Sequence, residues 1–210
     1  MNKRSTAIKD YFLRDINPVI RFLIVSDTIL SGASGLLGPI FALFVEDFVV
    51  GGNEAVAGLA AGIYLLTRSV LQIPIAHMID KIRGEKDDFW IMFVFTVLAS
   101  VAPIAYLLIN TPLELYIVQF MLGCFTAFTY PTYMAIFTRH IDKDKEGTEW
   151  GVYFTLTDLL SAVFGALGGY IASEKGFAPL IVGVSVMGLF GSLLLFPIRP
   201  YIRMKLKKSS

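Results

Sequence analysis

Three charged side chains, Asp27, Arg68 and Asp158, stand inside long apolar stretches of the sequence. A charge within the hydrocarbon of a bilayer costs at least ~2.5 kcal/mol by insertion scales, so such residues are retained for pairing or for function. Arg68 lies 14 residues after Glu54 and 12 before Asp80, near the middle of its stretch. These three side chains are therefore the first candidates for binding a proton, a charged cargo or one another.

Asp27 follows Arg21 by six residues and has no basic residue at its own depth. Burial among apolar groups disfavours the charged carboxylate, so Asp27 would hold a proton until a cavity or a cation relieves it. This interpretation predicts a proton or cation carrier. The alternative is a structural carboxylate that is hydrogen-bonded to helix ends near the cytoplasmic surface, and the sequence leaves both open.

Arg68 needs an acidic partner. At 1.5 Å per helical residue, Arg68 lies roughly 18 Å from Asp80 and Asp158 lies roughly 13 Å from Glu149, so the two depths nearly agree. We therefore expect Arg68 of one copy to pair with Asp158 of a second copy. Such a pair would either only fix how the copies associate or take part in transport and gating.

Further polar side chains recur at spacings of three and four in the same stretches and so share helix faces. Those able to hydrogen-bond a polar cargo are Ser31, Tyr64, Gln72, Gln119, Thr126, Tyr130 and Tyr153. Packing between helices accounts for tyrosines and threonines equally well. The sequence has no HExxH motif, no paired catalytic carboxylates and no serine–histidine arrangement, so we expect no enzyme.

The composition indicates a membrane protein. Apolar residues make up 55% of the 210 residues, and the mean hydropathy of +0.66 exceeds that of water-soluble domains. A net charge of +1 gives no reason to expect nucleic-acid binding, and the single cysteine, Cys124, excludes an intrachain disulfide and a cysteine-based metal cluster. We expect neither a metal nor a cofactor.

Six segments reach the roughly 20 apolar residues that a helix needs to cross a bilayer. They are Pro18 to Val45, Ala55 to Ile79, Phe89 to Ile109, Leu113 to Thr138, Gly151 to Ala172 and Pro179 to Ile198. The sequence thus predicts an all-α integral membrane protein with a six-helix transmembrane bundle over residues 18–198. An N-terminal arm (1–17) precedes the bundle and a basic tail (199–210) follows it.

Lysine and arginine residues predict the orientation, because they stay on the cytoplasmic side. Of the 18 in the chain, 16 fall in four places: the N-terminal arm through Arg21, the segments after the second and fourth helices, and the tail. The opposite loops carry Lys175 beside several acidic residues. We expect both termini in the cytoplasm and the bundle in the cytoplasmic, or plasma, membrane.

Small residues carry a resemblance to a known family. In the fourth helix Gly123, Ala127, Pro131 and Ala135 stand at steps of four. This pattern resembles the fourth helix of the major facilitator superfamily, in which an arginine often occupies the position of Gln119. The fifth helix, with its run of glycines, is similar to the small-residue fifth helix of that family.

The segment from Ala76 to Lys86 resembles the cytoplasmic loop motif of the same superfamily. Asp80 and Lys81 align with its aspartate and basic residue, which the family uses in gating. Ala76 stands where the motif begins with glycine, and Gly84 is one place late. This departure favours a second interpretation, an accessory or heterodimeric membrane subunit without transport activity of its own.

The resemblance implies one six-helix half of a transporter whose usual form has two such halves around the substrate site. In that family the first and fourth helices line the cavity, the second and fifth join the halves, and the third and sixth face lipid. We therefore expect a secondary transporter of a small solute that acts by alternating access. A second copy would complete it as a parallel homodimer, with the twofold axis along the membrane normal.

Overall fold

The computed structural model describes residues 16–81 and 84–202, which contain helices and no strand. Six helical segments in this part of the chain are long and apolar enough to cross a membrane, so the predicted all-α bundle is confirmed. The arm before residue 16, the loop residues Ile82 and Arg83 and the tail from residue 203 lie outside the described residues. The elements are α2 (Pro18–Leu37), η1 (Gly38–Ile40), α3 (Phe41–Phe48), α4 (Glu54–Lys81), α5 (Glu85–Val101), η2 (Ala102–Leu107), α6 (Pro112–His140), α7 (Glu146–Lys175), α8 (Phe177–Leu193) and η3 (Phe196–Tyr201).

Prolines interrupt three of the six segments. The first helix, predicted as continuous from Pro18 to Val45, breaks into α2, η1 and α3 around Pro39. Pro103 likewise turns the end of the third segment into the 3-10 helix η2, and Pro197 lies in η3 at the end of the sixth. Proline lacks the N–H that the preceding turn needs and its ring crowds that turn, so the helical path tightens or breaks there.

The fifth helix begins at Glu146, five residues before the predicted Gly151. The first turns of this helix pack against the rest of the bundle, because Glu149 is fully buried. The Glu149 carboxylate accepts a hydrogen bond from the backbone N–H of Asp142 at 3.2 Å. The Asp142 carboxylate in turn accepts one from the backbone N–H of Asn17 at 3.3 Å. This polar network fixes the start of α2, the α6–α7 loop and α7 at one end of the bundle.

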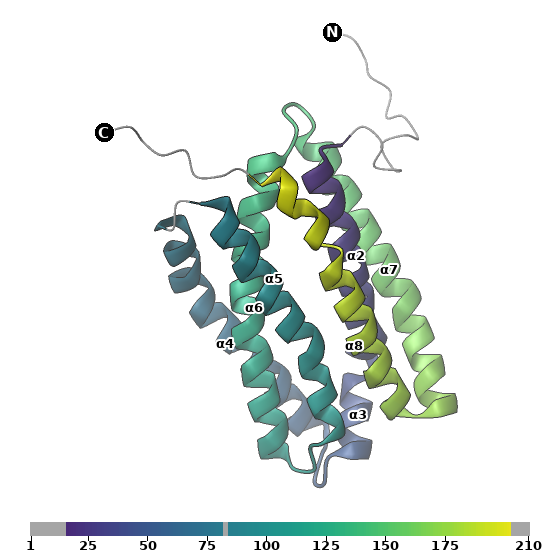
Figure 1. The fold of residues 1–210 in the computed structure, drawn as a ribbon. Coiled ribbons are helices and arrows are strands. Elements are labelled where there is room, and N and C mark those ends of the chain that lie inside the picture. Colours follow the sequence, from purple (N-terminus) through teal and green to yellow (C-terminus); the bar gives the residue numbers. More distant parts are fainter. Residues whose placement is uncertain (1–15, 82–83, 203–210) are drawn as a thin grey trace.

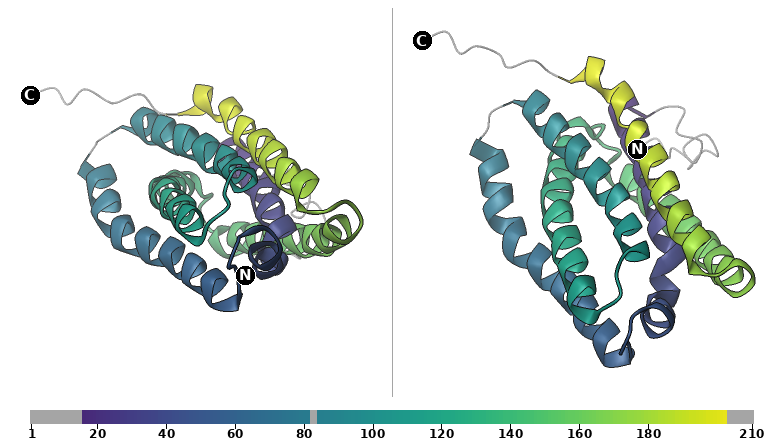
Figure 2. Two further views of the ribbon diagram at one scale, coloured as in Figure 1. Left: turned by 90° about the horizontal axis from the view of Figure 1, so that it is seen from below. Right: turned by 60° about the horizontal axis from the view of Figure 1, so that its bottom comes forward.

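The helices form an open arrangement in which α4 and α7 flank the bundle (Figures 1 and 2). The helix α4 packs mainly against α6, and α2 packs mainly against α7, while α5 and α8 lie against α6 and α2 respectively. Between α5 and α8 the hydroxyls of Ser100 and Ser192 are hydrogen-bonded at 2.9 Å. The outer faces of these two helices expose apolar side chains such as Val94 and Val186, as lipid-facing helices require.

Two glycines allow α2 and α7 to approach closely. A Cβ atom added at Gly168 would lie 1.9 Å from the backbone carbonyl oxygen of Leu36, and one added at Gly35 would lie 2.7 Å from that of Ser161. Without a hydrophobic force between helices in lipid, such close backbone packing is a main source of helix association. The α2–α7 contact therefore depends on these missing side chains.

We predict that Gly168→Ala destabilises the bundle, because the new methyl group overlaps the α2 backbone. The free energy of unfolding should fall by about 1–3 kcal/mol, as for other overpacked cores. Gly169→Ala is the matched control, since a Cβ at Gly169 meets no atom within 4 Å and alanine favours helix. Thermal unfolding in detergent measures both, and equal melting temperatures would contradict the close packing.

Candidate functional site

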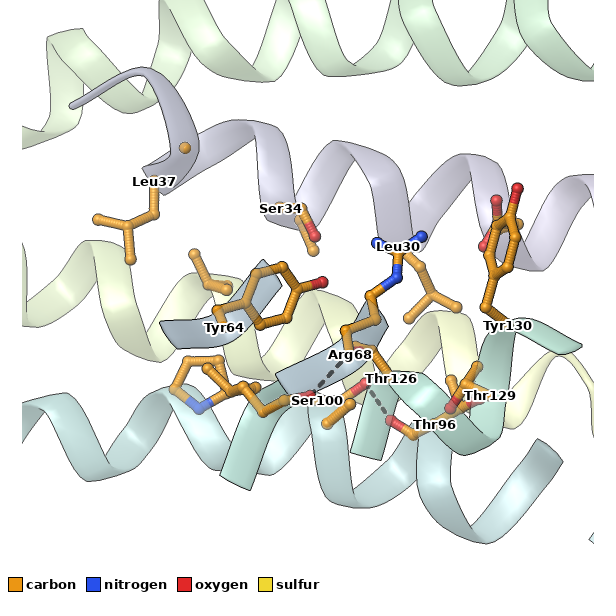
Figure 3. Close-up of a pocket in the computed structure, with 18 of the residues that line it drawn as sticks. Leu30, Ser34, Leu37, Tyr64, Arg68, Thr96, Ser100, Thr126, Thr129 and Tyr130 are labelled. Carbon is orange, nitrogen blue, oxygen red and sulfur yellow. Dashed lines mark hydrogen bonds between the residues drawn. The ribbon is translucent and has the colours of Figure 1, made fainter. Parts of the chain in front are cut away.

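A cavity of about 430 Å³ lies within the bundle (Figure 3). It is lined by residues of the helices α2 to α8 and of the two 3-10 turns η1 and η2. Its polar lining residues are Asp27, Ser34, Tyr64, Arg68, Thr96, Ser100, Tyr106, Gln119, Thr126, Thr129, Tyr130, Tyr133 and Tyr153. Its size lies in the range of small-molecule sites, which run from about 300 to 1,000 Å³. Apolar side chains, including Leu30, Leu122 and Val184, complete the walls.

Asp27 is held by a tyrosine from another helix. The phenol of Tyr153 on α7 donates a hydrogen bond to Oδ2 of Asp27 on α2 at 2.8 Å. Tyr153 is itself buried, with its ring packed against those of Tyr133 and Phe137. The structure therefore gives Asp27 a side-chain partner beside the cavity in place of the helix end that the alternative interpretation expected.

Tyr133 supplies a buried hydroxyl group to the cavity. Its side chain on α6 is 5% exposed and lines the cavity. Within the described residues no hydrogen-bond partner is found for its hydroxyl. A buried hydroxyl without a partner loses about 1–3 kcal/mol of hydration, so a bound molecule or water that accepted this bond would be favoured.

Arg68 reaches into the cavity from the middle of α4 (Figure 3). Its guanidinium carbon lies 4.9 Å from the centre of the Tyr130 ring, in a cation–π contact. None of the ion pairs seen in the described part of the chain involves Arg68. Asp158 is exposed on α7, so the two residues do not pair within one chain, and their pairing between two copies stays a prediction.

Three threonine hydroxyls of the lining donate to carbonyls of their own helices. Thr96 bonds to Met92 at 2.6 Å, Thr126 to Leu122 at 2.9 Å and Thr129 to Phe125 at 3.2 Å. Because a hydroxyl has one proton, these three groups present only acceptor lone pairs to a cargo.

Seven of the residues predicted as site candidates meet in this cavity: Asp27, Tyr64, Arg68, Gln119, Thr126, Tyr130 and Tyr153. Five others do not line it, and one of these is Asp158, which is exposed on α7. Ser31 lies in a shallow groove between α2 and α7, where its carbonyl accepts a hydrogen bond from Ser161 at 3.1 Å. Gln72 is half-buried one turn after Arg68, and Asp80 and Lys81 are exposed at the end of α4. The binding and gating roles of all these residues stay predictions.

The third and sixth helices expose apolar side chains on their outer faces, as predicted, but their inner faces also line the cavity. Thr96 and Ser100 of α5 and Gly188 of α8 line the cavity. The spacing of four between Thr96 and Ser100 puts both on one helix face, which was the available signal. The lack of charged residues in these segments hid it.

Comparison with known protein families agrees with this six-helix architecture. The family model of the Major Facilitator Superfamily matches residues 23–209. The chain belongs to the major facilitator superfamily. This membership confirms the resemblance seen in the small residues of α6 and α7, and with six apolar helices it supports an integral membrane protein.

Several superfamily relatives are similar over most of this chain. An MFS-type transporter of Methanocaldococcus jannaschii, described as uncharacterized, is 26% identical over 160 residues, which cover 76% of this chain and 40% of the relative. The multidrug resistance protein MdtG of Klebsiella pneumoniae is 21% identical over 194 residues, which cover 91% of this chain and 46% of the relative. MdtG of Escherichia coli is 23% identical over 181 residues, which cover 84% of this chain and 43% of the relative. The chain thus spans less than half the length of each of these relatives.

We predict that Tyr153→Phe destabilises the protein, because it leaves the Asp27 carboxyl without its phenol. A lost partner of this kind costs about 1–3 kcal/mol of unfolding free energy, measured by thermal unfolding in detergent. Tyr170→Phe is the control on the same helix, since Tyr170 is 65% exposed. If both variants melt together with the wild type, the Asp27–Tyr153 bond contributes nothing to stability.

Proposed function

We propose that this chain is a secondary transporter of a small solute that acts by alternating access. The observation that carries the proposal is the mid-bundle cavity, in which an acid and a base from different helices line one space of about 430 Å³. Superfamily membership and the relatives named as multidrug resistance proteins support the same class of activity. The bundle would sit in the plasma membrane with both termini in the cytoplasm.

A second six-helix bundle completes the site in this proposal. Asp158 lies 12 residues into the 30-residue helix α7 and is exposed in one chain, which is costly if that face meets lipid. On α4, Cβ atoms added at Gly58 and Gly62 would meet nothing within 4 Å, so that face is also open to close helix packing. We propose that a second copy, parallel and related by a twofold axis along the membrane normal, places its α4 against α7 of the first.

We predict that cysteines at Leu66 on α4 and Leu159 on α7 cross-link between differently tagged copies. Both positions are well exposed in one chain, at 67% and 59%. The experiment uses a Cys124→Ser background and lipid nanodiscs. Val186→Cys on α8, 61% exposed, is the control and should not cross-link with itself.

Two results would contradict this homodimer. One is a particle that contains a single copy at all concentrations, and the other is a dimer joined through Val186 on α8. The first would favour a different protein or segment as the second bundle.

Asp27 is the group that we propose couples transport to protons. The ionisable groups around it are Tyr153 on α7, Tyr130 and Tyr133 on α6, and Arg68 on α4 across the cavity. Two such acids would face one cavity in the homodimer, which discourages their simultaneous ionisation. Asp27 would then take up a proton and release it as the cargo changes.

We predict that Asp27→Asn abolishes proton movement and its dependence on pH while leaving assembly intact. Liposomes loaded with a pH-sensitive dye report proton entry together with naphthalenesulfonate, or proton exit in exchange for naphthyltrimethylammonium, when either probe is added outside. Glu174→Gln is the control, because Glu174 is an exposed acid near the end of α7 that does not line the cavity. A normal pH profile in Asp27→Asn would make Asp27 structural, and no movement of either probe by the wild type would favour the accessory subunit that the altered loop motif suggested.

A further inference from the structure

Arg68 places a permanent positive charge in the cavity. It lies 14 residues after the first residue of α4 and 13 before its last, roughly 20 Å from either end. Arginine stays protonated in proteins, so this charge cannot be removed by losing a proton. An anion is the remaining way to neutralise it.

The contact with Tyr130 orients the guanidinium without using its N–H donors in hydrogen bonds. A cation above an aromatic ring is attracted to the ring face, here at 4.9 Å from the ring centre. The N–H donors point outward in the guanidinium plane, where they match the two oxygens of a carboxylate or a similar group. The tyrosine therefore holds the fork in place, and none of the ion pairs between described residues uses its edge.

The walls of the cavity suit an anion with an apolar body. Gln119 is 6% exposed and lines the cavity, where its amide N–H group is a further donor. Leu30, Leu122 and Val184 offer apolar surface. Carboxylate, sulfonate and phosphate groups share the chemistry that such a fork recognises.

We propose that Arg68 binds the anionic group of an amphipathic organic anion, whose apolar body lies among Leu30, Leu122 and Val184. The role of this anion as the transported cargo rests on the transport function proposed above. Asp27 lines the same cavity, so its negative charge opposes the anion, and its protonation leaves Arg68 as the only charged group among the lining residues. Anion and proton therefore bind together, and their charges cancel.

A carboxylate from a second copy is a competing partner for Arg68. In the proposed homodimer Asp158 of a second copy faces α4, where it would compete for Arg68. The position of the guanidinium, inside the cavity and over Tyr130, favours a bound cargo.

The test is calorimetric titration of naphthalenesulfonate into the protein in nanodiscs, with naphthyltrimethylammonium as the cation of the same shape. Both probes keep their charge at all pH values used. We expect the wild type to bind the sulfonate and not the ammonium. Arg68→Gln should weaken binding about 10- to 100-fold, the range for losing hydrogen bonds to a charged group.

Two further variants keep the test decisive. Arg68→Lys retains a charge but loses the planar fork, so its affinity should fall between those of the wild type and Arg68→Gln. Arg199→Gln is the matched control, because Arg199 also lies over aromatic rings, 5.8 Å from Trp90, but does not line the cavity. Its affinity should match the wild type within about twofold, well inside the 1.4 kcal/mol of a tenfold change.

The dependence on pH tests the role of Asp27. Sulfonate binding should tighten as the pH falls in the wild type and stay tight at all pH values in Asp27→Asn, which mimics the protonated acid. Equal sulfonate affinity in Arg68→Gln, or binding of the ammonium alone, would overturn the proposal. Loss of the dimer in Arg68→Gln, restored by adding Asp158→Asn, would assign Arg68 to the interface instead. Binding without uptake into liposomes would overturn the proposed transport function and leave this inference standing.

Discussion

The cost of a charge in the hydrocarbon of a bilayer is the constraint on which this structure depends. It forces Asp27 and Arg68 away from lipid, and the bundle meets that demand by turning both toward one cavity. The phenol of Tyr153 then donates a hydrogen bond to Asp27, and the ring of Tyr130 contacts the guanidinium of Arg68. In each pair the two residues come from different helices. The charges thus decide which faces of α2, α4, α6 and α7 point inward.

Close packing supplies what the charges do not. Since lipid is as apolar as leucine, the helices associate where their backbones touch, and Gly35 and Gly168 make that possible for α2 and α7. At one end a network of Asn17, Asp142 and Glu149 ties the same helices together. The wall of the cavity that carries Asp27 is thereby fixed on both sides of the charged residue.

The sequence predicted the number of helices, their approximate bounds and several polar residues of the cavity, because charge and hydropathy are properties of single residues. Seven candidate residues line one cavity, among them Asp27, predicted as a binding residue, and Arg68, predicted as an interface residue. The sequence could not place Ser31 and Gln72, since a polar residue one turn away from a cavity has the same spacing as one that lines it. It also missed Tyr133, because an unpartnered hydroxyl depends on which neighbours the fold provides.

The order in which the helices contact one another has a consequence for biogenesis. The helix α2 packs mainly against α7, and α4 packs mainly against α6. Neither α2 nor α4 can therefore make its main contact until later helices have been synthesised. Until α6 is inserted, Arg68 lacks the Tyr130 ring, and until α7 is inserted Asp27 lacks its phenol. A nascent chain that ends after α5 therefore exposes both charges, and it would have to be held by the insertion machinery or by a membrane chaperone.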